Sequence, residues 1–210
     1  MKTLGAMLAL VLSTTSLASD PGVSGYGKTQ GVIPGVPLLF GPKLSLALPV
    51  PSVGLEVKFA NLIGASFDYG FFPDISVSGV TAGFPSGWHA DARLYPFRGA
   101  FFLGAALGQR SLRASYTTTV APFGQITPTS TLDVTYLAPE IGWRWVYESG
   151  LFMGVELGWE FVLSFKRTDS SEVQALRQAG GLDPNLDKAI NDYGNAGLPH
   201  VALFQIGYFF

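Results

Sequence analysis

Apolar and polar residues alternate with a period of two along most of this chain. In residues 137–147 one alternate set is apolar and rich in aromatic residues: Leu137, Pro139, Ile141, Trp143, Trp145 and Tyr147. The intervening set holds charged and small residues: Ala138, Glu140, Gly142, Arg144 and Val146. Segments 100–116 and 151–165 repeat the alternation. A helix would scatter these charges around its surface, whereas a strand directs them to one face, so the pattern predicts β-strands.

Eight segments fit a strand, and their connections alternate in length from the third strand onward. The predicted strands are 38–48, 53–60, 62–72, 86–97, 100–117, 131–147, 151–166 and 197–210. The tight turns are 60–62, 98–99 and 148–150, and the long loops are 73–85, 118–130 and 167–196. All tight turns and both chain ends therefore fall at one end of the sheet, and the long loops fall at the other.

The longest loop carries helical signals of its own. Ser170, Ser171 and Glu172 begin a helical pattern that runs to Gly180. Asp183 is the expected cap of a second short helix that begins at Pro184 and stops at Gly194. We expect two short helices outside the barrel, either as a plain lid over its mouth or as a binding surface.

Composition indicates which kind of sheet this is. Only 13% of the residues are charged, about half of the ~25% usual in soluble domains. No segment after the N-terminal region has the 18 or more consecutive apolar residues of a membrane-spanning helix. The apolar faces carry Trp and Tyr near their ends, as at membrane interfaces, and the charged faces are rich in Gly and Ala, which suits a crowded lumen. These features favour an all-β, eight-stranded antiparallel up-and-down transmembrane β-barrel over a soluble β-domain.

The N-terminus has the features of a secretory signal peptide. Lys2 supplies the positive charge, residues 4–12 form an apolar stretch, and Ser16 and Ala18 are the small residues of a cleavage site. A membrane anchor is the alternative, but the apolar run is far shorter than the ~20 residues that a spanning helix needs. The expected organisation is a signal peptide (1–18), an irregular Gly- and Pro-rich periplasmic arm (19–37) and the barrel (38–210).

The last seven residues are Phe204-Gln205-Ile206-Gly207-Tyr208-Phe209-Phe210, in which Phe210, Tyr208, Ile206 and Phe204 alternate. This ending resembles the C-terminal signal of outer-membrane barrels, and the chain after the signal peptide resembles the small eight-stranded barrels of the OmpA/OmpX type. The resemblance implies recognition by the barrel-assembly machinery through Phe210, a bacterial outer-membrane location, and contact with outer-membrane lipid and lipopolysaccharide. Because the predicted barrel runs to Phe210, we expect no soluble C-terminal peptidoglycan-binding domain of the kind that the longer members have.

The inward face predicted from the alternation contains charges of both signs. Its members are Lys43, Glu56, Lys58, Asp68, His89, Asp91, Arg93, Arg110, Glu140, Arg144, Glu156 and Glu160. Eight strands enclose an interior just wide enough for side chains, and buried charges must be paired. Turn-based register places Arg93 beside Gly104, Arg144 beside Gly154 and Lys58 beside Gly64. We expect a filled lumen, with Arg144 paired diagonally to Glu156.

Candidate chemistry is sparse. His89 and Asp91 share a face, and Ser66 or Ser86 would be the partner in a His–Ser arrangement like that of lipid-modifying barrels. Glu156 and Glu160 lie ~13 Å apart on one strand face, too far for a glycosidase pair. His200 is expected to face lipid near the outer boundary. We therefore assign no catalytic, cofactor-binding or metal-binding residue, and we expect neither a cofactor nor an enzyme.

Net charge and the lack of cysteine exclude further classes of protein. The absence of cysteine removes disulfides, thiolate metal sites and N-terminal lipidation, and the net charge of −2 argues against a nucleic-acid partner. The expected function is that of an integral outer-membrane barrel with a structural or surface-interaction role. The alternatives are a narrow, porin-like pore for small solutes and, third, a lipid-modifying enzyme. The external ligand is not predicted.

Overall fold

The computed structural model describes residues 38–48, 50–77, 80–120, 124–180 and 184–210. The expected signal peptide and periplasmic arm lie outside the described residues. The strands are β1 (Leu38–Leu48), β2 (Ser52–Phe59), β3 (Ile63–Val77), β4 (Val80–Leu94), β5 (Phe101–Tyr116), β6 (Thr118–Val120), β7 (Gly124–Ile126), β8 (Thr129–Val146), β9 (Leu151–Trp159), β10 (Phe161–Asp169) and β11 (Pro199–Tyr208). The helices are α2 (Ser171–Gln178) and α3 (Pro184–Asn195). None of the described helices is long and apolar enough to cross a membrane.

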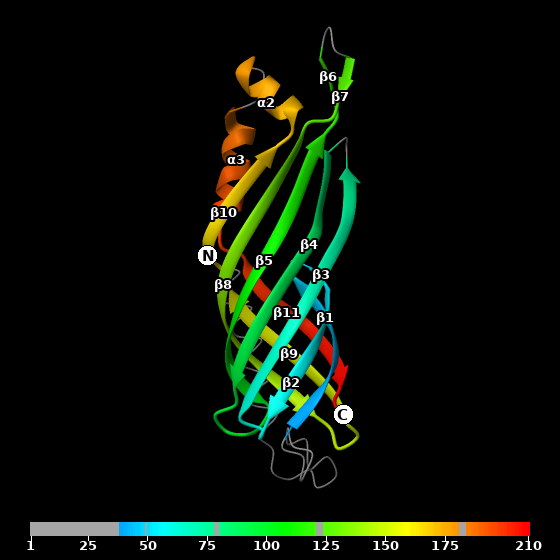
Figure 1. The fold of residues 1–210 in the computed structure, drawn as a ribbon, viewed down its shortest axis with the longest axis vertical. Coiled ribbons are helices and arrows are strands. Elements are labelled where there is room, and N and C mark those ends of the chain that lie inside the picture. Colours follow the sequence, from blue (N-terminus) through cyan, green and yellow to red (C-terminus); the bar gives the residue numbers. More distant parts are fainter. Residues whose placement is uncertain (1–37, 49, 78–79, 121–123, 181–183) are drawn as a thin grey trace, which may run out of the picture.

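Eight strands close into an antiparallel up-and-down barrel, as the sequence predicts (Figure 1). The order is β1-β2-β3-β4-β5-β8-β9-β11, and β11 pairs with β1 to complete the ring. The predicted seventh strand is divided into β9 and β10, which flank Glu160. β9 pairs with both β8 and β11, whereas β10 continues beyond the ring and pairs with β8 alone.

The tight turns at 60–62 and 148–150 are confirmed, and all three predicted turns lie at the end of the barrel where the C-terminus is found (Figure 1). Ala60 and Asn61 adopt positive φ values of 48° and 55°, the left-handed pair at the centre of the turn closed by the hydrogen bond from Leu62 N to Phe59 O. The turn around Arg98 (φ 52°) is longer than the predicted two residues, yet the register of β4 against β5 is the predicted one. Gly150 (φ 90°) occupies the position that only glycine takes without strain.

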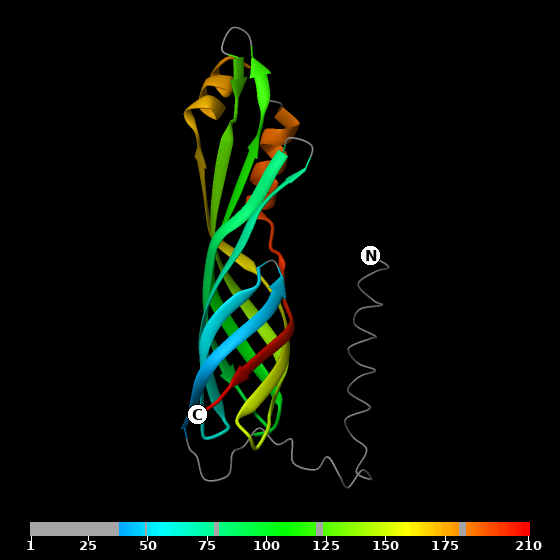
Figure 2. The same cartoon turned by 90° about the vertical axis from the view of Figure 1, so that its right-hand side faces the viewer.

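The other end departs from the predicted loops, because strand pairing continues where the sequence suggested loops. β3 and β4 pair as far as Val77 and Val80, so the segment 73–85 is mostly a hairpin. Bulges between Gly70 and Ile75 interrupt its period of two, and this hid the strand from pattern analysis. β3, β4, β5, β8 and β10 thus rise above the closed ring as a one-sided wall (Figures 1 and 2).

The outward face of the ring is apolar. In β1 the alternate residues Leu38, Phe40, Leu44, Leu46 and Leu48 are about half exposed, while the residues between them are buried. β2 continues the face with Val53, Leu55, Val57 and Phe59. Such regular exposure of large apolar side chains is far beyond what water-facing sheets carry. The two helices predicted in the last loop are confirmed, and they pack on β8 and β10 of the wall (Figure 2).

An ion-pair cluster joins the helices to the wall. Asp169, at the end of β10, accepts bonds of 2.7 Å from both Arg167 and Arg177, and Asp187 of α3 lies 2.7 and 2.9 Å from the same two guanidinium groups. Partial burial raises the pKa of Asp169, but hydrogen bonds from Ser130, Arg167 and Arg177 outweigh it and hold this pKa below its usual value. The hydrogen bond from Arg177 likewise lowers the pKa of Asp187.

Acid should therefore release the helices before it affects the barrel. Both carboxyl groups have lowered pKa values in the folded state, so their stabilisation is complete above the unfolded value of about 3.9 and is lost as pH falls below it. We expect the hydrogen-exchange protection of α2 and α3 to fall selectively below about pH 4. Asp187→Asn should show part of this loss at neutral pH. Asp192→Asn is the matched control, because Asp192 makes only an exposed pair with Lys188 on the same helix.

Candidate functional site

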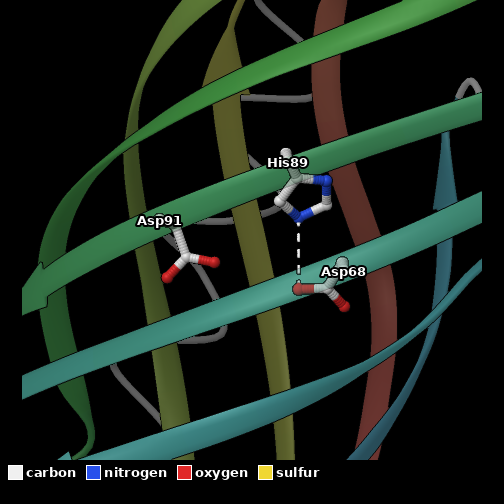
Figure 3. Close-up of side chains that lie close together, drawn as sticks. All are labelled: Asp68, His89 and Asp91. Atoms are coloured by element: carbon white, nitrogen blue, oxygen red, sulfur yellow. Dashed lines mark ion pairs between the residues drawn. The ribbon is translucent and has the colours of Figure 1, made fainter.

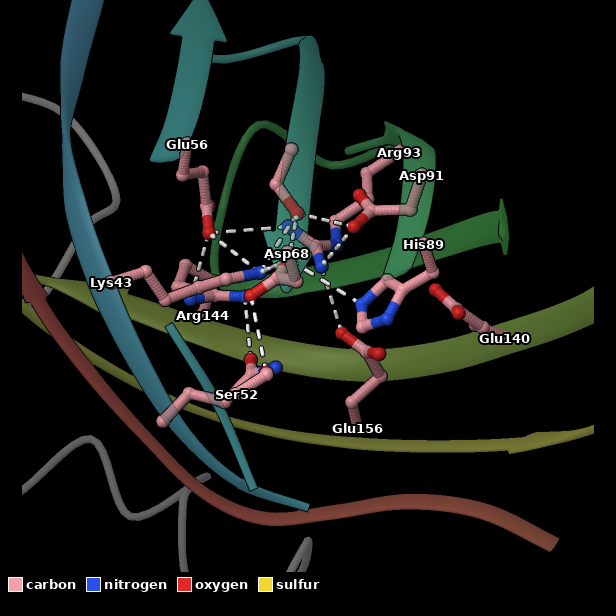
Figure 4. A network of polar contacts seen from close by, with 12 residues as sticks. Lys43, Ser52, Glu56, Asp68, His89, Asp91, Arg93, Glu140, Arg144 and Glu156 are labelled. Carbon is pink, nitrogen blue, oxygen red and sulfur yellow. Dashed lines mark hydrogen bonds and ion pairs between the residues drawn. The ribbon is translucent and has the colours of Figure 1, made fainter. Parts of the chain in front are cut away.

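The charged residues of the inward face predicted from the alternation are buried in the interior of the barrel. The fully buried members, at most 5% exposed, are Lys43, Glu56, Lys58, Asp68, Asp91, Arg93, Arg110, Glu140, Arg144, Glu156 and Glu160. His89 faces the same interior with a side chain that is 12% exposed. Alternation along each strand brings these residues inward, and ring closure brings their strands face to face. Figure 4 shows most of them converging.

Small residues beside the charges make this convergence possible. Arg93 lies opposite Gly104, Arg144 opposite Gly154 and Glu140 opposite Gly158, as the turn register predicts. A Cβ atom on Gly154 would lie 3.0 Å from Nε of Arg144 and equally close to the backbone oxygen of Trp143, so a side chain at this position would crowd Arg144. Glycine at these positions therefore leaves the room in which the long side chains lie across the lumen.

Glu56 is the centre of the inner part of the network. Its Oε2 atom lies 2.9 Å from Nη1 of Arg144, 3.2 Å from Nη1 of Arg93 and 3.8 Å from Nζ of Lys43. Arg144 also donates a 2.6 Å hydrogen bond to Oε1 of Gln205. Three buried cations thus share one carboxylate. Lys43 is paired also with Asp68, and Arg93 with Asp91 and Glu156, whereas the other hydrogen bond of Arg144 goes to the neutral amide of Gln205.

The predicted pair of Arg144 with Glu156 is wrong. The backbone diagonal is present, since Arg144 lies opposite Gly154 on β9, but the guanidinium extends across the lumen to Glu56 on β2 instead. Its Cζ atom lies over the ring of Phe152, 4.9 Å from the centroid. Glu156 is paired with Arg93 at 2.9 Å. Strand register fixes neighbours on the wall, but it does not fix which side chains meet across the interior.

A second group surrounds Asp68 (Figure 3). Its carboxylate accepts bonds from Lys43 at 2.8 Å and Ser66 at 2.9 Å, and His89 Nε2 lies 3.4 Å away. Ser66 also donates to Asp91, which is held by Arg93 at 3.0 Å. The Ser66 hydroxyl is thus bound by carboxylates and a lysine, and the described contacts of His89 are with Asp68 and the His200 ring. A His–Ser nucleophile pair has no support in this arrangement.

His200 is buried in the lumen, and the expectation that it faces lipid is wrong. Its Nε2 atom lies 3.3 Å from Oε1 of Glu156 and 3.5 Å from Oε1 of Glu140. The cause is a bulge in β11: Ala202 pairs with Glu156 but Gln205 with Gly154, so one extra residue is inserted. Leu203 and Phe204 are both exposed, and every residue before them changes face. The prediction assumed strict alternation back from Phe210, which does not allow for an inserted residue.

The outer end of the lumen is closed by a further ion pair. Arg110 contacts Glu160 at 2.8 Å, and its guanidinium lies 5.7 Å from the centroid of the Tyr193 ring, on α3. A cavity of about 30 Å³ lies next to this pair and is bounded also by His89, His200 and Tyr136. This is space for about one water molecule. Glu156 and Glu160 bind different arginines, so they do not act as a carboxylate pair.

Two side-chain groups have the composition of metal ligands: Asp68, His89 and Asp91 form one, and Glu140, Glu156 and His200 form the other. Within each group the possible ligand atoms all lie within 4.8 Å of one another. The sequence pattern predicts no metal-binding residue. Gln205 and His200 were not predicted to face the lumen, although alternation counted back from Phe210 does place Gln205 on the inward face.

The fold and site define a closed eight-stranded antiparallel barrel with a lumen filled by buried ion pairs. Among solved structures, this chain is similar to CarO2 of Acinetobacter baumannii, with 13% identity, a TM-score of 0.41, and coverage of 82% of this chain and 98% of that one. It is similar also to CarO of the same organism, with 12% identity, a TM-score of 0.42, and coverage of 81% and 97%. No family model matches the chain, and no curated protein matches it.

The pairing of Arg144 with Glu56 can be tested by a double-mutant cycle. Arg144→Met leaves part of the buried charge of Glu56 without a partner, so the free energy of unfolding should fall by about 3 kcal/mol. Adding Glu56→Gln should recover part of this loss, because the glutamine is neutral. Adding Glu156→Gln is the matched control and should recover none, since Glu156 is bound by Arg93. Urea unfolding midpoints in lipid vesicles give the measurement, and recovery with Glu156→Gln alone would refute the assignment.

Proposed function

We propose that this chain is an integral bacterial outer-membrane protein of the small eight-stranded OmpA/OmpX type, with a plugged lumen and a structural or surface-interaction role. The observation that carries the proposal is the contrast between the two barrel faces. The outward face presents large apolar side chains at alternate positions, and the inward face consists of fully buried ion pairs. An apolar outer surface around a charged interior is the reverse of a water-soluble protein, and it is stable only in surroundings less polar than water.

Aromatic rings near the tight-turn end support a membrane interface there. Phe210 lies 6.0 Å from Phe40 and 5.2 Å from Tyr208, measured between ring centroids. Phe101 is similarly placed against Phe97 and Trp143. Aromatic girdles of this kind border the apolar band of outer-membrane barrels. The band between the girdles would contact outer-membrane lipid and lipopolysaccharide, and the exposed Phe210 would be read by the barrel-assembly machinery.

The wall and helices above the ring supply the surface for an external role. The ion pairs among Arg167, Asp169, Arg177 and Asp187 stabilise α2 and α3 against the wall. The filled lumen argues against transport, and the absence of a His–Ser pair among the described contacts argues against a lipid-modifying enzyme. We therefore propose no catalytic activity and no nucleic-acid partner, and we retain a narrow pore as the alternative.

Membrane insertion is tested by placing a charge on the outward face. Leu55, 65% exposed on β2, should not tolerate Leu55→Arg, because an arginine at the lipid face near the midplane costs about 2–4 kcal/mol. We expect loss of the heat-modifiable band in outer-membrane fractions. The matched control is Ser76→Arg, on the part of β3 that extends beyond the pairing with β2, and it should leave that band unchanged. Recovery of Leu55→Arg as a folded membrane protein would contradict the proposal.

Conductance distinguishes a plugged barrel from a pore. The unmutated protein should show no steady openings in planar bilayers, because Arg93 and Arg144 are the largest of its fully buried side chains and they cross the lumen. Arg93→Ala with Arg144→Ala is the positive control and should conduct. Steady large openings of the unmutated protein would favour the pore. A changed lipid A mass on expression would favour the enzyme.

A further inference from the structure

Three potential metal ligands from three adjacent strands meet in the lumen. Glu140 belongs to β8, Glu156 to β9 and His200 to β11, and all three are buried. Gly158 of β9 is the register partner of both Glu140 and His200, so the two side chains approach each other across a residue without a side chain. A Cβ atom on Gly158 would lie 3.1 Å from Cγ of Glu140 and 3.5 Å from Cβ of His200. The group is therefore built by the strand register.

Glu140 has no hydrogen bond to balance its burial. Its side chain is 0% exposed, and neither of its carboxylate oxygens has a hydrogen-bond partner among the described residues. The nearest cationic candidate is Nε2 of His200, 3.5 Å from Oε1, and this nitrogen is shared with Glu156. Arg93 is occupied by Glu56, Asp91 and Glu156. A buried carboxylate in this condition needs a positive partner to remain ionised.

The charges of the lumen lead to the same requirement. Its buried carboxylates are Glu56, Asp68, Asp91, Glu140, Glu156 and Glu160, and its buried cations are Lys43, Lys58, Arg93, Arg110 and Arg144. The described interior therefore has one carboxylate more than it has lysines and arginines. The excess is located at Glu140, because each of the other five carboxylates has a lysine or arginine close by.

We propose that Glu140, Glu156 and His200 form a binding site for a divalent transition-metal cation of the Zn²⁺ class. Zinc binds imidazole nitrogen and carboxylate oxygen at about 2.0–2.2 Å, and tetrahedral geometry then separates neighbouring ligand atoms by about 3.3–3.6 Å. His200 Nε2 lies 3.3 Å from Oε1 of Glu156 and 3.5 Å from Oε1 of Glu140. Two of the three separations between ligand atoms therefore match those around a single tetrahedral ion, and the ligand atoms of all three residues lie within 4.8 Å of one another. The imidazole favours such a metal over Mg²⁺ or Ca²⁺, which take oxygen ligands.

The neighbouring group of Asp68, His89 and Asp91 is a poorer site and provides the control. Both of its carboxylates already have a cationic partner, since Lys43 lies 2.8 Å from Asp68 and Arg93 lies 3.0 Å from Asp91. In the proposed site Arg93 is paired with Glu156, but Glu140 has no lysine or arginine partner among the described ion pairs. The rings of His89 and His200 are in contact, with centroids 5.2 Å apart, so the two groups are neighbours in the lumen. Figure 4 shows Glu140 and Glu156 close to His89. The cavity of about 30 Å³ is bounded by both histidines.

The experiment is a zinc titration of the purified, refolded barrel without a polyhistidine tag, after treatment with a chelator. Calorimetry should show one Zn²⁺ bound per chain at neutral pH, without displacement by a hundredfold excess of Mg²⁺. Glu140→Gln and His200→Gln should each weaken zinc binding at least tenfold. His89→Gln, the matched control from the adjacent group, should change it less than threefold.

Folding of each variant is checked by heat-modifiable mobility, and thermal unfolding gives a second readout. Glu140→Gln keeps the shape of the side chain and removes the unbalanced charge, so it should fold. Zinc should raise the unfolding midpoint of the unmutated protein but not that of Glu140→Gln. Absence of zinc binding by the unmutated protein would overturn the proposal. So would unchanged binding in folded Glu140→Gln, or equal losses in His89→Gln and His200→Gln.

Discussion

The narrow interior of an eight-stranded ring is the constraint on which the rest of this structure depends. Such a ring encloses too little space for a water-filled channel, so side chains must fill it. In this protein the filling residues are charged, and burial makes each unpaired charge costly. The positions of Glu56, Arg93 and Arg144 follow from this constraint, because each lies where opposite charges from other strands can reach it. Glycines opposite the long side chains provide the necessary volume.

Buried charges also define which face of each strand is the inside. A slip of one residue in register exchanges the two faces of a strand. In β2 such a slip would expose Glu56 and Lys58 on the apolar outer surface and would direct Leu55 and Val57 into the ionic network. Both consequences are unfavourable, so the correct register is separated from its neighbours by a large energy difference. An apolar filling would remove this distinction, since both faces would then be alike.

The sequence predicts those features that depend on local periodicity. The eight strands, the inward charges, the tight turns and the Arg93–Gly104 and Arg144–Gly154 register pairs follow from alternation and turn length. The structure differs wherever the period is interrupted or the contact is distant. Bulges concealed the hairpin extension of β3 and β4, and Arg144 pairs with Glu56 from a strand on the opposite wall. Neither feature can be predicted from the local alternation of apolar and polar residues.

The bulge in β11 shows how a single irregularity can decide the chemistry of the lumen. Without the extra residue at Leu203–Phe204, strict alternation from the exposed Phe210 would direct His200 outward. Glu140 and Glu156 would then face each other without the imidazole that now lies between them. The bulge also leaves two consecutive apolar side chains on the outer surface, which an apolar environment tolerates and water would not favour. In the proposed membrane location, apolar surroundings would therefore permit the irregularity that gives the inner face its histidine.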